Sequence, residues 1–130
     1  SLFLNIMPST GIAIYDQVVR QVKFAVAQGA VKPGNLVPSV REMARELAIN
    51  PNTVARAYQQ LQTDGVLESV RGMGLEVATD AVKQCKSERR KLIQERIRQA
   101  LVEAKHSGLE DDELRQLVDK QLASVLRDGR

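Results

Sequence analysis

The sequence predicts a mostly helical protein in which three short helices and a β-hairpin are followed by two longer helices. Apolar residues recur every three to four positions in several separate stretches, which is the period of an amphipathic helix. Capping and turn residues stand at the ends of these stretches. Helical spacing is interrupted only between residues 66 and 78, where a glycine-containing turn divides two short apolar runs.

The first helix is expected to begin at Ile14. Val18, Val22 and Val26 follow it at helical spacing. Gly29 is a typical residue at a helix C-terminus, because glycine adopts the left-handed conformation without a steric penalty. The apolar residues 2–6 that precede this helix are expected to be extended.

The second and third helices are separated by only about two residues, which makes them a candidate helix-turn-helix. Ser39 and Glu42 have the spacing of a capping box at the start of the second helix. Asn50 is a good N-cap and Pro51 suits the first position of the third helix. Residues 64–65, Asp-Gly, are expected to end it.

A β-hairpin is expected next, with strands at residues 66–70 and 75–78 and its tip at residues 71–74. Three helices followed by a hairpin is the element order of a winged helix-turn-helix. The predicted organisation is therefore a winged helix-turn-helix domain over residues 1–79 and a helical dimerisation tail over residues 80–130.

The tail is predicted to hold one helix over residues 81–106 and a second after the acidic residues 110–113, which favour a helix N-terminus. Two helices with one apolar face each are too small to enclose a core alone, so they can pack on the winged domain, on a second copy of the chain, or on both. A homodimer is the simplest of these arrangements, since it would bury both faces and present the two copies of the third helix with two-fold symmetry. The apolar positions expected at the dimer interface are Leu92, Ile93, Ile97, Leu101, Leu114, Leu117, Val118 and Leu122.

Composition argues against most enzyme classes. One cysteine and one histidine leave no disulfide framework, no multi-cysteine metal site and no recognisable nucleophile–base pair, so neither catalysis nor a cofactor is expected. No export or membrane-spanning segment is visible, and we expect a cytoplasmic protein without a membrane partner. The net charge of +3 permits nucleic-acid binding without demonstrating it.

The physical argument for DNA binding rests on the helix after Asn50. On a wheel of about 100° per residue, Asn52, Arg56 and Gln59 fall opposite the apolar stripe, on a face without acidic residues. Asparagine and glutamine can bond adenine bidentately, and arginine can do the same to guanine. An ordinary solvated helix face is the alternative interpretation.

Candidate phosphate contacts lie on the neighbouring elements. Arg41 and Arg45 are one turn apart on the second helix, and this like-charge pair would gain from an anionic partner. Ser39, at the N-terminus of that helix, suits a phosphate, although it serves equally as the N-cap. Arg71 at the hairpin tip suits a wing contact, or is simply part of a surface turn.

Residues 14–78 resemble the N-terminal domain of the GntR family of bacterial transcription regulators, and the short tail is similar to the YtrA-type branch. The matching segments are Ile14-Tyr15-Asp16-Gln17-Val18, Lys32-Pro33-Gly34, Leu36-Val37-Pro38-Ser39-Val40-Arg41-Glu42, Asn50-Pro51-Asn52-Thr53-Val54-Ala55-Arg56-Ala57-Tyr58, Leu61, Asp64-Gly65 and Arg71-Gly72-Met73-Gly74.

The resemblance implies that the tail dimerises. Because two helices can hardly enclose a pocket of about 300 Å³, any site for a small-molecule effector is expected at the dimer interface, and whether there is such an effector is left open. Two positions depart from the family pattern: Ala13 replaces a frequent proline of the branch, and Ala55 stands where many relatives outside it have arginine. The family's DNA-contacting sites fall on Ser39, Arg41, Asn50, Asn52, Thr53, Arg56 and the wing glycine Gly72.

The expected function is a sequence-specific regulator, a repressor, that binds double-stranded DNA at a palindromic operator as a homodimer. The alternative is a winged-helix protein-interaction module, which would carry acidic or apolar residues on the outer face of the third helix. The complete set of predicted DNA-binding residues is Ser39, Arg41, Arg45, Asn50, Asn52, Thr53, Arg56, Gln59, Arg71 and Gly72.

Overall fold

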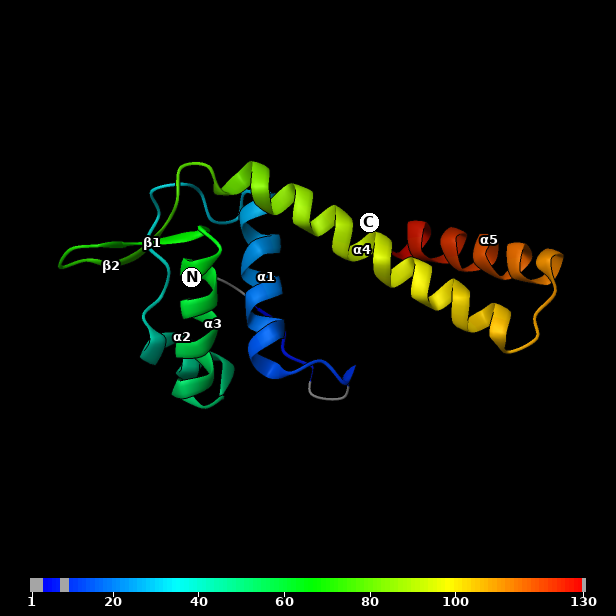
Figure 1. Cartoon of the computed structure of the whole chain (residues 1–130), viewed down its shortest axis with the longest axis horizontal. Helices are drawn as coiled ribbons and strands as arrows, with labels where there is room; N and C mark the ends of the chain where they lie inside the picture. Colours follow the sequence, from blue (N-terminus) through cyan, green and yellow to red (C-terminus); the bar gives the residue numbers. More distant parts are fainter. Residues whose placement is uncertain (1–3, 8–9, 130) are drawn as a thin grey trace. The chain divides into compact units, whose positions relative to one another are not determined.

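The computed structural model describes residues 4–7 and 10–129, which fall into two compact units, one up to Arg90 and one from Lys91. The element order confirms the predicted mostly helical fold with a winged helix-turn-helix. The elements are α1 (Ile14–Gln28), α2 (Val40–Leu47), α3 (Pro51–Thr63), β1 (Leu67–Val70), β2 (Gly74–Val77), α4 (Ala81–His106) and α5 (Asp111–Asp128) (Figure 1).

The helix ends coincide with the capping residues read from the sequence. Gly29 ends α1 in the left-handed conformation, with φ of 82°. Ser39 and Glu42 form the capping box of α2: the Ser39 Oγ accepts from the Glu42 N–H at 3.1 Å, and the Ser39 N–H donates to Glu42 Oε1 at 3.0 Å. These hydrogen bonds hold the pKa of Glu42 below its usual value.

The core of the first unit lies between α1, α2, α3 and the base of the hairpin. Helices α1 and α3 lie side by side (Figure 1), and α2 packs against α3. Ala81 and Cys85, in the first turns of α4, are fully buried in the same core, so this helix begins as part of the first unit. The largest fully buried side chains are Met43, Leu61, Leu67, Val18, Val22, Val26, Val54, Val66, Val77 and Cys85.

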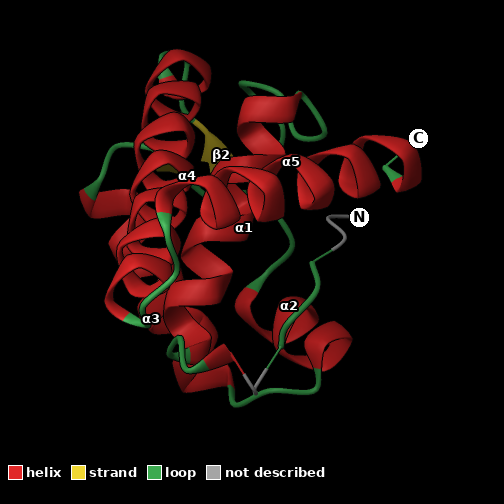
Figure 2. Ribbon diagram, turned by 90° about the vertical axis from the view of Figure 1, so that its right-hand side faces the viewer, coloured by secondary structure: helices red, strands yellow, loops and turns green. Residues whose placement is uncertain are grey.

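The hairpin is antiparallel, with Leu67 opposite Val77 and Val70 opposite Gly74. Because Gly74 pairs with Val70, the second strand begins one residue earlier than predicted and the tip shortens to residues 71–73. Figure 2, in which strands are yellow, shows how small this sheet is beside the helices.

The segment that leads into α2 pairs with the outer edge of β2. The Val37 N–H donates to the Leu75 carbonyl at 2.9 Å, and the Val77 N–H donates to the Asn35 carbonyl at 3.0 Å. Sequence reasoning read this segment only as a turn and a connection. The pairing ties the wing to the residues immediately before Ser39, so the wing and the N-terminus of α2 are fixed relative to each other.

Lys23 of α1 joins three elements of the first unit. Its ammonium group lies 2.8 Å from Asp64, which follows α3, and 2.6 Å from Glu88 of α4. Burial alone would lower the pKa of Lys23, but the hydrogen bonds and charges of the two carboxylates outweigh it and raise that pKa. Gln84 adds a 2.6 Å hydrogen bond to the Asp64 carbonyl, which further attaches α4 to the end of α3.

The second unit has no interior of its own. No described residue from 91 to 129 is buried, although both of its helices carry apolar side chains. Ile97, Leu122 and Val125 are 57%, 53% and 62% exposed. None of the helices in the described parts of the chain is both long and apolar enough to cross a membrane. Within residues 91–129, the apolar faces of this unit therefore remain largely exposed.

Candidate nucleic-acid interface

The outer face of α3 presents the predicted base-reading residues to solvent. Val54, Ala57, Tyr58 and Leu61 are buried, as the sequence pattern predicted. Opposite them Asn52, Arg56 and Gln59 are exposed, while Thr53 is half-buried. This surface can donate and accept hydrogen bonds and carries no carboxylate.

Two of the predicted contact residues also cap helices. Asn50 Oδ1 accepts from the Asn52 N–H at 2.8 Å, just as Ser39 caps α2. Within the described residues, the Asn50 side-chain amide forms no hydrogen bond, whereas the Ser39 hydroxyl lies beside the Glu42 carboxylate and helps to lower its pKa. Asn50 therefore fixes the N-terminus of α3 and retains a donor for a phosphate oxygen.

The predicted phosphate-binding arginines lie on α2 and on the wing. Arg41, Arg45 and Arg71 are exposed, and none of them forms an ion pair within the described residues. Gly72, at the wing tip, has φ of 77°, a conformation that favours glycine over other residues. Arg71 is therefore carried on a tight turn with a small neighbour.

Tyr58 fixes the separation between α3 and the start of α2. Its hydroxyl donates to the Pro38 carbonyl at 2.8 Å, directly before Ser39. Burial raises the pKa of Tyr58 well above its usual value, so the phenol stays protonated and keeps donating. This bond fixes the predicted phosphate-contacting residues of α2 relative to the predicted base-reading face of α3.

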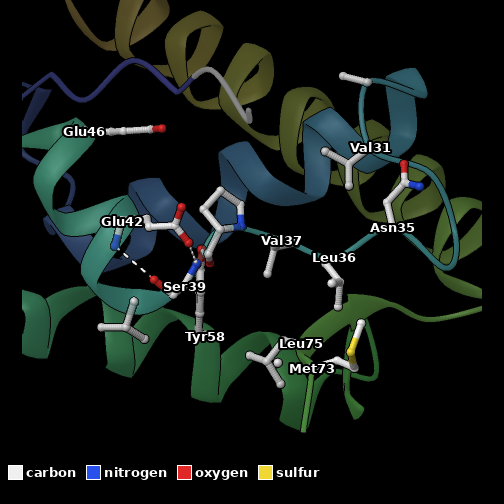
Figure 3. Close-up of a pocket in the computed structure, with 14 residues that line it drawn as sticks. Val31, Asn35, Leu36, Val37, Ser39, Glu42, Glu46, Tyr58, Met73 and Leu75 are labelled. Carbon is white, nitrogen blue, oxygen red and sulfur yellow. Dashed lines mark hydrogen bonds between the residues drawn. The ribbon is translucent and has the colours of Figure 1, made fainter. Parts of the chain in front are cut away.

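A groove of about 800 Å³ lies between the wing and α2 (Figure 3). Met73 and Leu75 line it from the wing, and Glu42 and Glu46 line it from α2. The two carboxylates make this groove unfavourable for a DNA phosphate, since like charges repel. Ser39 also lines this groove, whereas Arg41, Arg45 and Arg71 do not.

Sequence reasoning missed the partner of Arg56. The Arg56 guanidinium carbon lies 3.8 Å from the centroid of the Tyr15 ring, which comes from the first turn of α1. Because Tyr15 follows the apolar spacing of α1, the sequence alone predicts a core residue at this position. The contact depends on how α1 and α3 pack, which helical periodicity does not reveal.

The described residues include no group of three or more histidine, cysteine, aspartate or glutamate side chains that could hold a metal ion. The predicted DNA-binding residues instead come together on α2, α3, the turn between them and the wing of one unit. The predicted dimerisation residues lie on α4 and α5: Leu92 and Leu114 are half-buried, and the other six are exposed.

Comparison with known proteins identifies a family. The family described as "Bacterial regulatory proteins, gntR family" matches residues 14–77. The HTH-type transcriptional repressor YtrA of Bacillus subtilis (strain 168) is 32% identical over 127 residues, which are 98% of this chain and 97% of that protein.

Two solved structures are similar as well. A GntR family transcriptional regulator from Listeria monocytogenes matches with a TM-score of 0.68 and 27% identity, over 86% of this chain and 97% of that one. The AraR DNA-binding domain in complex with operator ORX1 matches with a TM-score of 0.50 and 25% identity, over 58% of this chain and 96% of that one.

Proposed function

We propose that this chain, which belongs to the GntR family of bacterial regulatory proteins, represses transcription by binding a palindromic operator as a homodimer. Its relatives are transcription regulators with a DNA-binding domain of this fold, and its similarity to YtrA extends over nearly the whole of both chains. The observation that carries the proposal is the acid-free, exposed outer face of α3, flanked by arginines that form no ion pair with the described part of the chain.

Base reading is assigned to α3. Asn52 and Arg56 lie in its N-terminal half, the part of a recognition helix that reaches base edges in the major groove. Ser39, Arg41, Arg45 and Arg71 flank this face and supply phosphate contacts, which fix the register of the protein without reading sequence. The AraR DNA-binding domain, which is similar to 58% of this chain, was solved in complex with an operator, and this supports DNA binding as the function.

Dimerisation is assigned to the second unit. Residues 91–129 enclose no buried interior for its exposed apolar faces, and covering these faces removes apolar surface from water. Shallow apolar grooves of about 470 and 350 Å³ lie along these faces, lined by Ile97, Leu101 and Val102 and by Leu101, Leu114 and Val118 respectively. A second copy would supply the side chains that fill them.

The Arg56→Ala variant tests the assignment of α3. We expect it to weaken operator binding by about 1–3 kcal/mol per half-site and to relax base preference at one position of each half-site. Fluorescence anisotropy with operator and scrambled duplexes measures both effects. Arg127→Ala, which removes an exposed arginine near the end of α5, is the matched control and should bind as the wild type does. Equal operator affinity of Arg56→Ala and wild type would remove Arg56 from the interface.

A further inference from the structure

The contact between Arg56 and Tyr15 assigns a task to a residue outside the recognition helix. We propose that Tyr15 is a positioning residue for DNA recognition, which holds the Arg56 guanidinium over its ring in the orientation that reads a base. This inference rests on the proposed function, because it takes Arg56 to be a base contact.

The geometry leaves Arg56 able to bond while it is held. A guanidinium stacks on an aromatic ring through its flat face, whereas its N–H groups point outward in its own plane. Bidentate recognition of guanine O6 and N7 uses those in-plane donors. At 3.8 Å from the ring centroid, Arg56 can therefore keep the stacking contact and donate to a base edge at once.

No carboxylate competes for Arg56 within the described residues. It takes part in none of their ion pairs, and the outer face of α3 carries no acid. The Tyr15 ring thus holds the guanidinium without neutralising its charge. An aspartate in that place would hold the arginine equally well but would consume the donors that DNA needs.

The Tyr15 ring is itself a rigid support. It is half-buried and packs against the core cluster of the first unit. Two residues later, the buried Gln17 fixes the segment that precedes α1: its side-chain oxygen accepts from the Met7 N–H at 2.8 Å, and its amide donates to the Met7 and Ile12 carbonyls at 2.9 and 3.0 Å. Because the Tyr15 ring is packed against the core, it restricts the Arg56 side chain before DNA arrives, so less side-chain freedom is lost on binding.

A double-mutant cycle tests the proposal. The probe is a duplex that the wild-type protein selects from a randomised library, compared with a scrambled duplex of the same composition. Tyr15→Leu should weaken binding to the selected duplex about 5- to 25-fold in a dimer that uses two Arg56 residues, and leave the scrambled duplex unchanged. Tyr15→Phe keeps the ring and should stay within about twofold of wild type.

The decisive comparison is made between variants that lack Arg56. If Tyr15 acts through Arg56, Tyr15→Leu/Arg56→Gln should bind no more weakly than Arg56→Gln alone. Libraries selected by Tyr15→Leu and by Arg56→Gln should lose base preference at the same position, which a general loss of stability would not produce. Tyr15→Met, which keeps apolar bulk, replaces Tyr15→Leu if thermal unfolding shows that the latter is not folded at the assay temperature.

Three results would overturn the inference. Wild-type or tighter binding by a folded Tyr15→Leu or Tyr15→Met protein would mean that the ring is dispensable or withholds Arg56 from DNA. Additive losses in the double variant would mean that Tyr15 acts independently of Arg56. Wild-type affinity in Arg56→Gln would reject Arg56 as a contact, and failure of the wild type to select any sequence would reject the proposed function itself.

Discussion

A chain that ends at Arg90 is expected to be a folded monomer that binds its operator about 10²–10⁴-fold more weakly than the full chain, because the second half-site no longer adds its contacts. It retains every described residue that is buried, including Ala81 and Cys85. A cut after residue 79, where the sequence predicts the domain to end, would remove these two side chains. For the full chain and the chain that ends at Arg90, sedimentation equilibrium measures the oligomeric state and fluorescence anisotropy measures the operator affinity.

Full-length variants separate loss of the dimer from loss of the tail. Leu122→Asp places a charge on the apolar face of α5, where Leu122 is 53% exposed in one chain. It should give a monomer with the weakened affinity of the truncated chain, since an unpaired buried charge is costly at an interface. Lys120→Asp lies on the opposite face of the same helix and should remain dimeric. A dimer at micromolar concentration after truncation would move the dimer contact to the first unit.

Operator affinity should fall about 10³–10⁵-fold between about 50 and 200 mM salt, because each phosphate contact releases counterions. Arg41, Arg45 and Arg71 from two chains would supply about six such contacts, and Ser39 would add a neutral one in each chain. The slope of the logarithm of the operator-binding constant against the logarithm of the salt concentration, measured by anisotropy, gives the number of phosphate contacts. A nearly flat slope would contradict the assignment of these residues to the DNA backbone.

The wing arginine allows a sharper form of the salt experiment. Arg71→Ala should make the slope shallower by about two in a dimer, about one for each chain, without changing which sequence is preferred. Lys120→Ala removes an exposed charge from α5 and should leave the slope unchanged. If Arg71→Ala altered base preference instead, the wing would be reading a groove rather than contacting the backbone.

The sequence predicts local structure well because local signals determine it. The Ser39–Glu42 capping box, the Asn50–Pro51 start and the left-handed Gly29 each act within one turn of backbone, and the structure has all of them. The buried stripe of α3 follows in the same way from spacing alone. These features need no knowledge of what packs against each helix.

The missed features all join elements that are distant in sequence. The pairing of residues 35–37 with β2 is made by backbone groups, so side-chain alternation carries little trace of it. The Tyr15–Arg56 contact depends on the packing of α1 against α3. The burial of Cys85 likewise depends on residues that the first unit supplies, which helical spacing within α4 does not identify.

That cysteine also provides a way to follow detachment of α4 from the rest of the first unit. Cys85 is the only thiol in the chain, and burial raises its pKa to about 11, so near neutral pH it is protonated and shielded from alkylating reagents. Such a reagent would reach it only while the first turns of α4 are lifted out of the core. The alkylation rate would therefore report the free energy of that local opening. Comparison of the rates with and without operator DNA would show how much DNA binding raises this free energy.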